Sequence, residues 1–201
     1  MWIIMIAIAA VMLIVMVNLK SGQKVQDGPF DIRAISDSND EVSIILEKVR
    51  FNLSGNVDIP TGVKTIGYEV FKGMNDIESV NIHGKVKIIG VRAFDGCSMI
   101  REIYTGESTE SICDEAFQGC TSLEIVKIGP RAKKIGLKSF ASCPNIKSIT
   151  LDGYDIPEAF SDTFDDSIKA NCALNIHKDC SEKLRKTPGW DKFCNIIEID
   201  N

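Results

Sequence analysis

Seven cysteines and two histidines are the side chains of this 201-residue chain best suited to bind a metal, form disulfides or act as nucleophiles. No two cysteines have the Cys-x-x-Cys spacing of a zinc site. The sequence also lacks the motifs of serine hydrolases, zinc proteases and P-loop nucleotide-binding proteins. His83 and His177 are far apart, and neither lies in a motif with a nucleophile. We therefore identify no catalytic, metal-binding or cofactor-binding residue, and we expect a protein that is not an enzyme.

Three of the cysteines recur at a fixed interval of 23 residues, and Met74 fills the same position one interval earlier. These three are Cys97, Cys120 and Cys143. A position that accepts Met or Cys favours a buried free thiol that packs as a small apolar group. Stacked neighbours would have parallel Cβ vectors, which suit a disulfide poorly. One bridge in the C-terminal region remains an alternative, among Cys172, Cys180 and Cys194.

The elements that position these cysteines belong to an internal repeat of the same 23-residue period. Its clearest column is Phe71, Phe94, Phe117 and Phe140. A second column is Ile66, Ile89, Ile112 and Ile135. Each copy contains two short extended pieces separated by a turn, and the piece Ile77–Ile82 is an apolar-x-x-apolar-x-apolar strand. One such turn cannot bury its own apolar edge, so successive turns are expected to stack about 4.8 Å apart and align each Phe with the next.

The repeat predicts a β-rich α/β solenoid of the leucine-rich class, with an N-terminal transmembrane helix and a C-terminal cap. Four regular copies occupy the centre, and the stretch that follows keeps Phe164 but shifts it by one residue. The segments that we expect are 1–19 as a transmembrane anchor or signal, 20–29 as a linker, 30–56 as an N-terminal cap, 57–152 as four regular repeats, 153–176 as a degenerate fifth repeat and 177–201 as a C-terminal cap.

The first 19 residues carry no charged side chain, and Trp2 to Val17 is an unbroken apolar run. A membrane-spanning helix needs about 20 apolar residues, with about 17 as the lower limit. No basic residue precedes the run and no small-residue cleavage pair ends it, so an uncleaved anchor is favoured over a cleaved signal peptide. Lys20 and Lys24 follow the run, and the positive-inside rule on its own favours a main domain in the cytoplasm.

The repeats resemble the BspA-like leucine-rich repeats. The units Lys87–Thr105 and Glu110–Ile128 carry the pattern Ile-Gly-x-x-Ala-Phe-x-Gly-Cys-x-x-Leu-x-x-Ile-x-Ile, with a few exceptions. Asp40–Pro60 resembles the N-terminal capping segment of that family, and Cys172–Phe193 resembles its C-terminal cap, whereas Gly153–Ala170 departs from the pattern. The resemblance implies a protein displayed on the cell surface or in the periplasm that adheres to other proteins or cells.

The outward side chains of the longer strand are the candidate binding residues. They include a column of alternating charge and one place where an aromatic and an aliphatic side chain lie in neighbouring strands. We predict a partner-binding patch of Glu78, Arg101, Tyr104, Glu124, Ile125, Lys127 and Lys147.

The expected function is a membrane-anchored, non-catalytic module for protein recognition or adhesion, with a protein or glycoprotein ligand. The alternative is a structural spacer that binds nothing itself. The chain has a net charge of −5 and its Lys and Arg residues are scattered along the sequence, so we expect no nucleic-acid partner.

Overall fold

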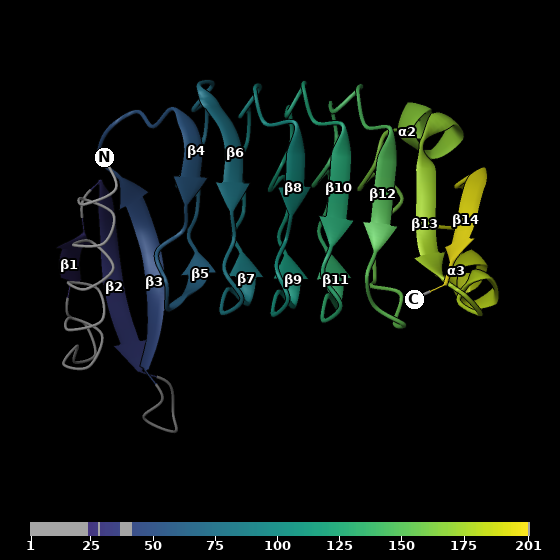
Figure 1. Ribbon diagram of the computed structural model, residues 1–201, viewed down its shortest axis with the longest axis horizontal. Coiled ribbons are helices and arrows are strands. Elements are labelled where there is room, and N and C mark those ends of the chain that lie inside the picture. Colours follow the sequence, from purple (N-terminus) through teal and green to yellow (C-terminus); the bar gives the residue numbers. More distant parts are fainter. Residues whose placement is uncertain (1–23, 28, 37–41, 201) are drawn as a thin grey trace.

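The computed structural model describes residues 24–27, 29–36 and 42–200, which form one elongated solenoid (Figure 1). In this part of the chain the strands form two sheets. The first sheet has the order β1 (Lys24–Asp27), β2 (Phe30–Ser36), β3 (Val42–Val49), β5 (Val63–Ile66), β7 (Ile88–Ile89), β9 (Ser111–Ile112) and β11 (Lys134–Ile135). The second has the order β14 (Asn195–Ile199), β13 (Ala173–His177), β12 (Ser148–Leu151), β10 (Ile125–Ile128), β8 (Glu102–Tyr104), β6 (Ile77–Asn81) and β4 (Gly55–Asp58).

Each regular repeat supplies one strand to each sheet, and the strands pair parallel with their equivalents in the next repeat. In the second sheet Val126 of β10 lies opposite Ile103 of β8 on one side and Ile149 of β12 on the other. In the first sheet Ile112 lies between Ile89 and Ile135. These partners are 23 residues apart, so the period predicted from the sequence is also the register of the solenoid.

A stack of aromatic rings runs through the core along the solenoid axis. Neighbouring ring centroids are 4.9 to 5.3 Å apart, and the ring planes lie within 9° of parallel. The rings are Phe71, Phe94, Phe117, Phe140 and Phe164. Phe30 meets one end edge-on, and Trp190 and Phe193 cover the other. All of these rings are buried, so the predicted aromatic column is confirmed.

Phe164 joins the stack although it follows Phe140 by 24 residues and not 23. The backbone N–H of Phe140 donates to Thr163 O at 3.0 Å, just as that of Phe117 donates to Ser139 O at 2.9 Å. The extra residue is therefore accommodated before Thr163, and the degenerate repeat keeps the stacking of the regular ones.

The two ends of the solenoid contain more regular structure than we expected. β1 lies within residues 20–29, where we expected a linker, and it pairs antiparallel with β2. β2 also pairs antiparallel with β3, so a small antiparallel unit caps the first sheet. At the other end β13 and β14 extend the second sheet, and the short helices α2 (Asp166–Asn171) and α3 (Ser181–Lys186) flank them. Backbone pairing therefore continues into both caps.

Within residues 24–27, 29–36 and 42–200, no helix is long and apolar enough to cross a membrane. The transmembrane anchor that we predict over residues 1–19 lies outside the described residues.

Candidate functional site

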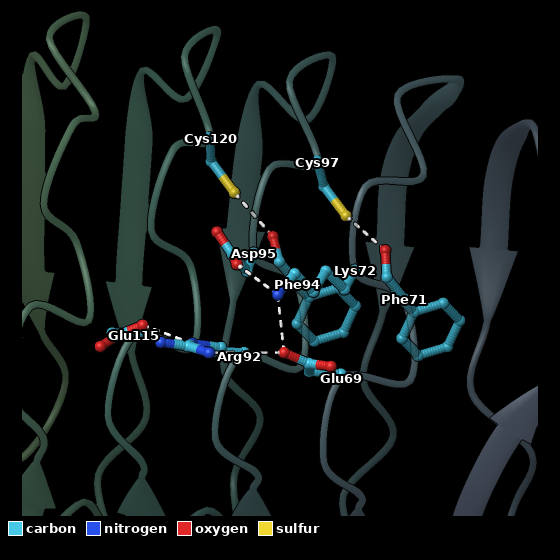
Figure 2. Close-up of polar contacts among 9 residues, drawn as sticks. All are labelled: Glu69, Phe71, Lys72, Arg92, Phe94, Asp95, Cys97, Glu115 and Cys120. Carbon is cyan, nitrogen blue, oxygen red and sulfur yellow. Dashed lines mark hydrogen bonds and ion pairs between the residues drawn. The ribbon is translucent and has the colours of Figure 1, made fainter.

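All seven cysteines are free thiols, so the disulfide considered for the C-terminal region does not form. The thiols of the repeat column are buried, and each donates to a phenylalanine carbonyl of the preceding turn. Figure 2 shows Cys97 Sγ pointing at Phe71 O and Cys120 Sγ pointing at Phe94 O, at 3.1 and 3.3 Å. Burial raises the pKa of Cys97 and of Cys143 to about 12. At neutral pH these thiols are protonated and serve as packing groups, not as nucleophiles or metal ligands.

The two histidines lie in different parts of the solenoid. His177 is buried, its Nε2 lies 2.8 Å from Asp152 O, and its ring stacks on Tyr154 with centroids 4.4 Å apart. His83 is half-buried and lies 4.0 Å from a carboxylate oxygen of Asp58. Among the described residues no three His, Cys, Asp or Glu side chains gather closely enough to hold a metal ion.

The parallel register places Tyr104, Ile125 and Lys127 of the predicted patch on the neighbouring strands β8 and β10 of the second sheet. The patch residues that directly precede β8, β10 and β12 are Arg101, Glu124 and Lys147, and Glu78 lies in β6. Lys127 of β10 lies opposite Tyr104 of β8, and Ile125 lies opposite Glu102. Ile125 keeps 37% of its surface exposed on this face. The strands thus hold Tyr104, Ile125 and Lys127 at fixed positions, as predicted from their spacing.

Much of the charge on this face is neutralised by ion pairs between neighbouring turns. Lys147 Nζ lies 2.6 Å from Glu124 Oε2, and Lys127 Nζ lies 3.3 Å from Glu102 Oε1. Arg101 is 78% exposed, and its guanidinium comes only to within 3.9 Å of Glu124. Glu78 is exposed and forms no ion pair with another described residue. Glu78, Arg101 and Ile125 are therefore the patch residues with the fewest side-chain contacts to other described residues.

Tyr104 is held in place by its hydroxyl group. The side chain is half-buried, and its O–H donates to Glu107 Oε1 at 2.5 Å. Burial, together with the negative charges of Glu107 and Asp152, raises the pKa of Tyr104. The phenol is therefore neutral at physiological pH, and its hydroxyl contact with Glu107 orders the half-buried side chain.

The structure adds a group of residues at the carboxyl ends of these strands that we did not predict from sequence. Glu107 follows β8, Asp152 follows β12, and Tyr154 stacks on His177 of β13. Burial raises the pKa of the Asp152 carboxyl, and the nearby ammonium of Lys127 partly opposes that effect. Tyr154 is 68% exposed, so a second aromatic side chain borders the predicted patch.

These added residues lie in turns, where the repeat pattern is weakest. The turns stack closely because glycines line them: a Cβ on Gly129 would lie 2.0 Å from Gly106 O. In the sequence, only glycines such as Gly106 and Gly129 indicate that the backbones of neighbouring turns approach each other closely. Which side chains then project from the stacked turns depends on the tertiary structure.

A second group of charged side chains pairs between neighbouring turns, at the bend that follows the strands of the first sheet. We call Glu69, Arg92 and Glu115 the ladder. Arg92 Nε lies 2.5 Å from Glu115, and Arg92 Nη1 lies 3.6 Å from Glu69 (Figure 2). Lys72 Nζ bridges Glu69 at 2.6 Å and Asp95 at 3.4 Å. The backbones of Glu69, Arg92 and Glu115 have φ between 53° and 57°, so the same left-handed bend recurs in each turn. These charges neutralise one another, and we assign them a structural role.

Comparisons with known structures support the fold. A leucine-rich-repeat protein of T. pallidum, TpLRR, shares 20% sequence identity over 88% of this chain and 83% of its own, with a TM-score of 0.67. A leucine-rich cell surface protein of Faecalibacterium prausnitzii shares 18% identity over 86% of this chain and 44% of its own, with a TM-score of 0.62. The pneumococcal vaccine antigen PcpA shares 14% identity over 78% of this chain and 39% of its own, with a TM-score of 0.60.

The present chain thus spans less than half the length of the F. prausnitzii and pneumococcal structures. A search of curated proteins gave no match. The model of the BspA-type leucine-rich-repeat region matches residues 50–171 in six copies, which cover the regular repeats, most of the degenerate repeat and part of the N-terminal cap. With its 23-residue register, its stacked phenylalanines and this match over more than half of its length, the chain belongs to the BspA-type leucine-rich-repeat family.

Proposed function

We propose that this chain is a recognition module that binds a protein or glycoprotein partner through the outer face of the second sheet. The observation that carries the proposal is the register that places Tyr104 directly opposite Lys127 and one strand away from Ile125. Tyr and Arg side chains contribute to binding energy out of proportion to their number, whereas exposed Lys and Glu contribute little. We therefore place the contact centre at Arg101, Tyr104 and Ile125.

The rigidity of this face favours binding. Its strands are held by parallel backbone pairing on both sides, and Tyr104 is fixed by Glu107. Side chains that are already ordered lose little conformational entropy when a partner binds. Tyr154, at the carboxyl end of the same sheet, extends the contact surface beyond the residues predicted from sequence.

The experiment is a binding measurement against a panel of purified extracellular glycoproteins, with the double variant Arg101→Ala, Tyr104→Ala. We expect it to weaken binding about 30-fold or more, which corresponds to about 2 kcal/mol, with little change in Tm. The matched control reverses two exposed charges on the first-sheet side, Lys87→Glu and Lys133→Glu, and should bind normally.

A control variant that loses binding while the Arg101/Tyr104 variant keeps it would move the site to the first-sheet side. If the wild-type chain binds no member of the panel, the spacer function is favoured. The ion pairs of Glu124 with Lys147 and of Glu102 with Lys127 suit that function, since they satisfy charges on the face without any partner.

We further infer that residues 1–19 anchor the module in a membrane and that the solenoid is displayed on the cell surface or in the periplasm. The support is the uncharged apolar run from Trp2 to Val17 together with the surface display typical of this family. The solenoid should fractionate with membranes and be degraded by protease added to intact cells, or to cells whose outer membrane is opened. Full protection in both treatments would place it in the cytoplasm, as Lys20 and Lys24 favour.

A further inference from the structure

A cavity of about 270 Å³ in the C-terminal cap gathers basic side chains that are dispersed along the sequence. Its lining residues are Ser161, Lys169, Arg185, Lys186, Pro188, Gly189, Asp191 and Lys192. Four cations thus face one lining carboxylate, in a chain whose net charge is −5. The cavity is separate from the strand face described above.

The walls of this cavity are fixed by close packing. Gly189 has φ +86°, and a Cβ there would lie 2.8 Å from the carbonyl carbon of Ala159, so the loop presses against the degenerate repeat. The next residue, Trp190, is buried and donates from Nε1 to Pro157 O at 2.8 Å. The loop that carries Asp191 and Lys192 is therefore held in position before any ligand arrives.

Lys169 is the unusual member of the group, because its side chain is only 4% exposed. Its Nζ donates to Ser161 O at 2.6 Å and to Asp166 Oδ1 at 3.0 Å. An ammonium has three donors, and these protein acceptors use two of them. Asp166 offsets the charge of this buried ammonium, and the third donor is left for a ligand in the cavity.

Arg185 and Lys192 are exposed, and neither lies within ion-pair distance of an acidic group among the described residues. Lys186, by contrast, is paired with Glu182 at 2.5 Å. The guanidinium of Arg185 presents planar donors that suit the oxygens of sulfate and phosphate groups. Arg185 and Lys192 are thus available to an anion that enters the cavity.

We propose that this cavity, the cap cavity, binds the sulfate or phosphate group of an anionic ligand through Lys169, Arg185 and Lys192. A sulfate or phosphate ester has three non-bridging oxygens and can accept from all three side chains at once, whereas a carboxylate has two oxygens. The volume suits one such group with a few further atoms, and it is smaller than a typical pocket for a drug-sized ligand, about 300 Å³ or more. The group comes either from a free inorganic ion or from a sulfated sugar.

The test is isothermal titration of the full chain, kept in non-ionic detergent, at 0.15 M NaCl. The probes are sodium sulfate, sodium phosphate, a heparin-derived tetrasaccharide and the same tetrasaccharide without its sulfate groups. Binding of the inorganic ions identifies a free-ion site, and binding of only the sulfated tetrasaccharide identifies an esterified ligand. The tetrasaccharide without sulfate groups is expected not to bind in either case.

The variant Arg185→Gln, Lys192→Gln should weaken binding at least tenfold. The matched control is Arg131→Gln, Lys138→Gln, which also removes one exposed Arg and one exposed Lys and should change affinity less than twofold. Both pairs lie at the surface, so both variants should keep the wild-type Tm, and the amide resonance of Gly189 should shift on titration of the wild type. No binding by the wild type, unchanged binding by the cavity variant, or equal loss in the control would overturn the proposal.

Discussion

The rings of Phe94 and Phe117 stack with their centroids 5.2 Å apart and their planes 1° from parallel. The two residues come from successive turns and are both fully buried. The aromatic contact therefore repeats the strand spacing of the sheets, because the same backbone register sets both. The stability of the solenoid should depend strongly on the central rings of this stack.

Replacing Phe94 by Ala should lower the free energy of unfolding by about 3 to 5 kcal/mol, because it removes buried surface and leaves a cavity. Replacing Phe117 by Ala should have a similar effect. Phe51 is 62% exposed, so Phe51→Ala is the control and should change stability little. Chemical denaturation followed by circular dichroism measures all three, and a wild-type midpoint for the Phe94 variant would contradict the stacked core.

The thiols should react with an alkylating agent in an order set by burial. Cys194 is exposed and should be modified first. Cys97 and Cys143 are buried, with a pKa raised to about 12 by that burial, and should react only after denaturant is added. The thiolate is the reactive form, so even at pH 8 little of it exists at these two positions. Mass spectrometry of labelled peptides gives the order in which the cysteines react. Rapid labelling of Cys97 in the native protein would show that its thiol does not point into the core.

Ser142 offers a test of backbone strain, because it occupies a position that is glycine in the other regular repeats. Its φ is 57°, in the left-handed region, and the equivalent glycines have φ between 70° and 74°. A non-glycine residue there costs roughly 1 to 2 kcal/mol, partly offset by the greater chain entropy of unfolded glycine. Ser142→Gly should therefore stabilise the protein by up to about 1 kcal/mol.

The reciprocal change is Gly119→Ser, which should destabilise the solenoid by a similar amount. A Cβ at Gly119 would lie no closer than 3.6 Å to its neighbours. Any loss of stability in the variant therefore reflects the backbone conformation and not a steric clash. Thermal unfolding compares the two variants. Equal shifts of the same sign would contradict the strain argument.

The ladder of Glu69, Arg92 and Glu115 predicts a pH dependence of stability. Hydrogen bonding to Arg92 lowers the pKa of the Glu115 carboxyl, and hydrogen bonding to Lys72 lowers that of Glu69. A carboxylate whose pKa is lower in the folded state stabilises the fold above its unfolded pKa, near 4.5, and this contribution is lost as the pH falls through the folded value. Glu115→Gln should therefore lower Tm slightly at pH 7.

The same variant should melt like the wild type once the pH lies below the lowered pKa of Glu115, because the carboxyl is then protonated in both the folded and the unfolded state of the wild-type protein. Thermal melts in a series of buffers from pH 3 to 7 measure the difference. A Tm difference that stays constant over this range would show that the Glu115 charge does not act through Arg92.

The sequence by itself determined the repeating part of this protein. A strict 23-residue spacing of Phe71, Phe94 and Phe117 predicted the stacked core, and the equivalent slots of Met74 and Cys97 predicted inward thiols. Period and register are the same quantity in a solenoid, because each turn contacts only its neighbours. The 23-residue repeat pattern was therefore enough to predict the fold, the core residues and the outward faces of the strands.

The tertiary structure decided what happens where the period breaks. Lys169, Arg185 and Lys192 are scattered in the sequence, and only the fold of the cap, with Gly189 packed against Ala159, brings them around one cavity. No periodic signal predicts such contacts, because they join segments with no repeat relationship, through loops whose path is set by packing. The repeats were thus readable from spacing alone, whereas the basic group in the cap required the three-dimensional arrangement.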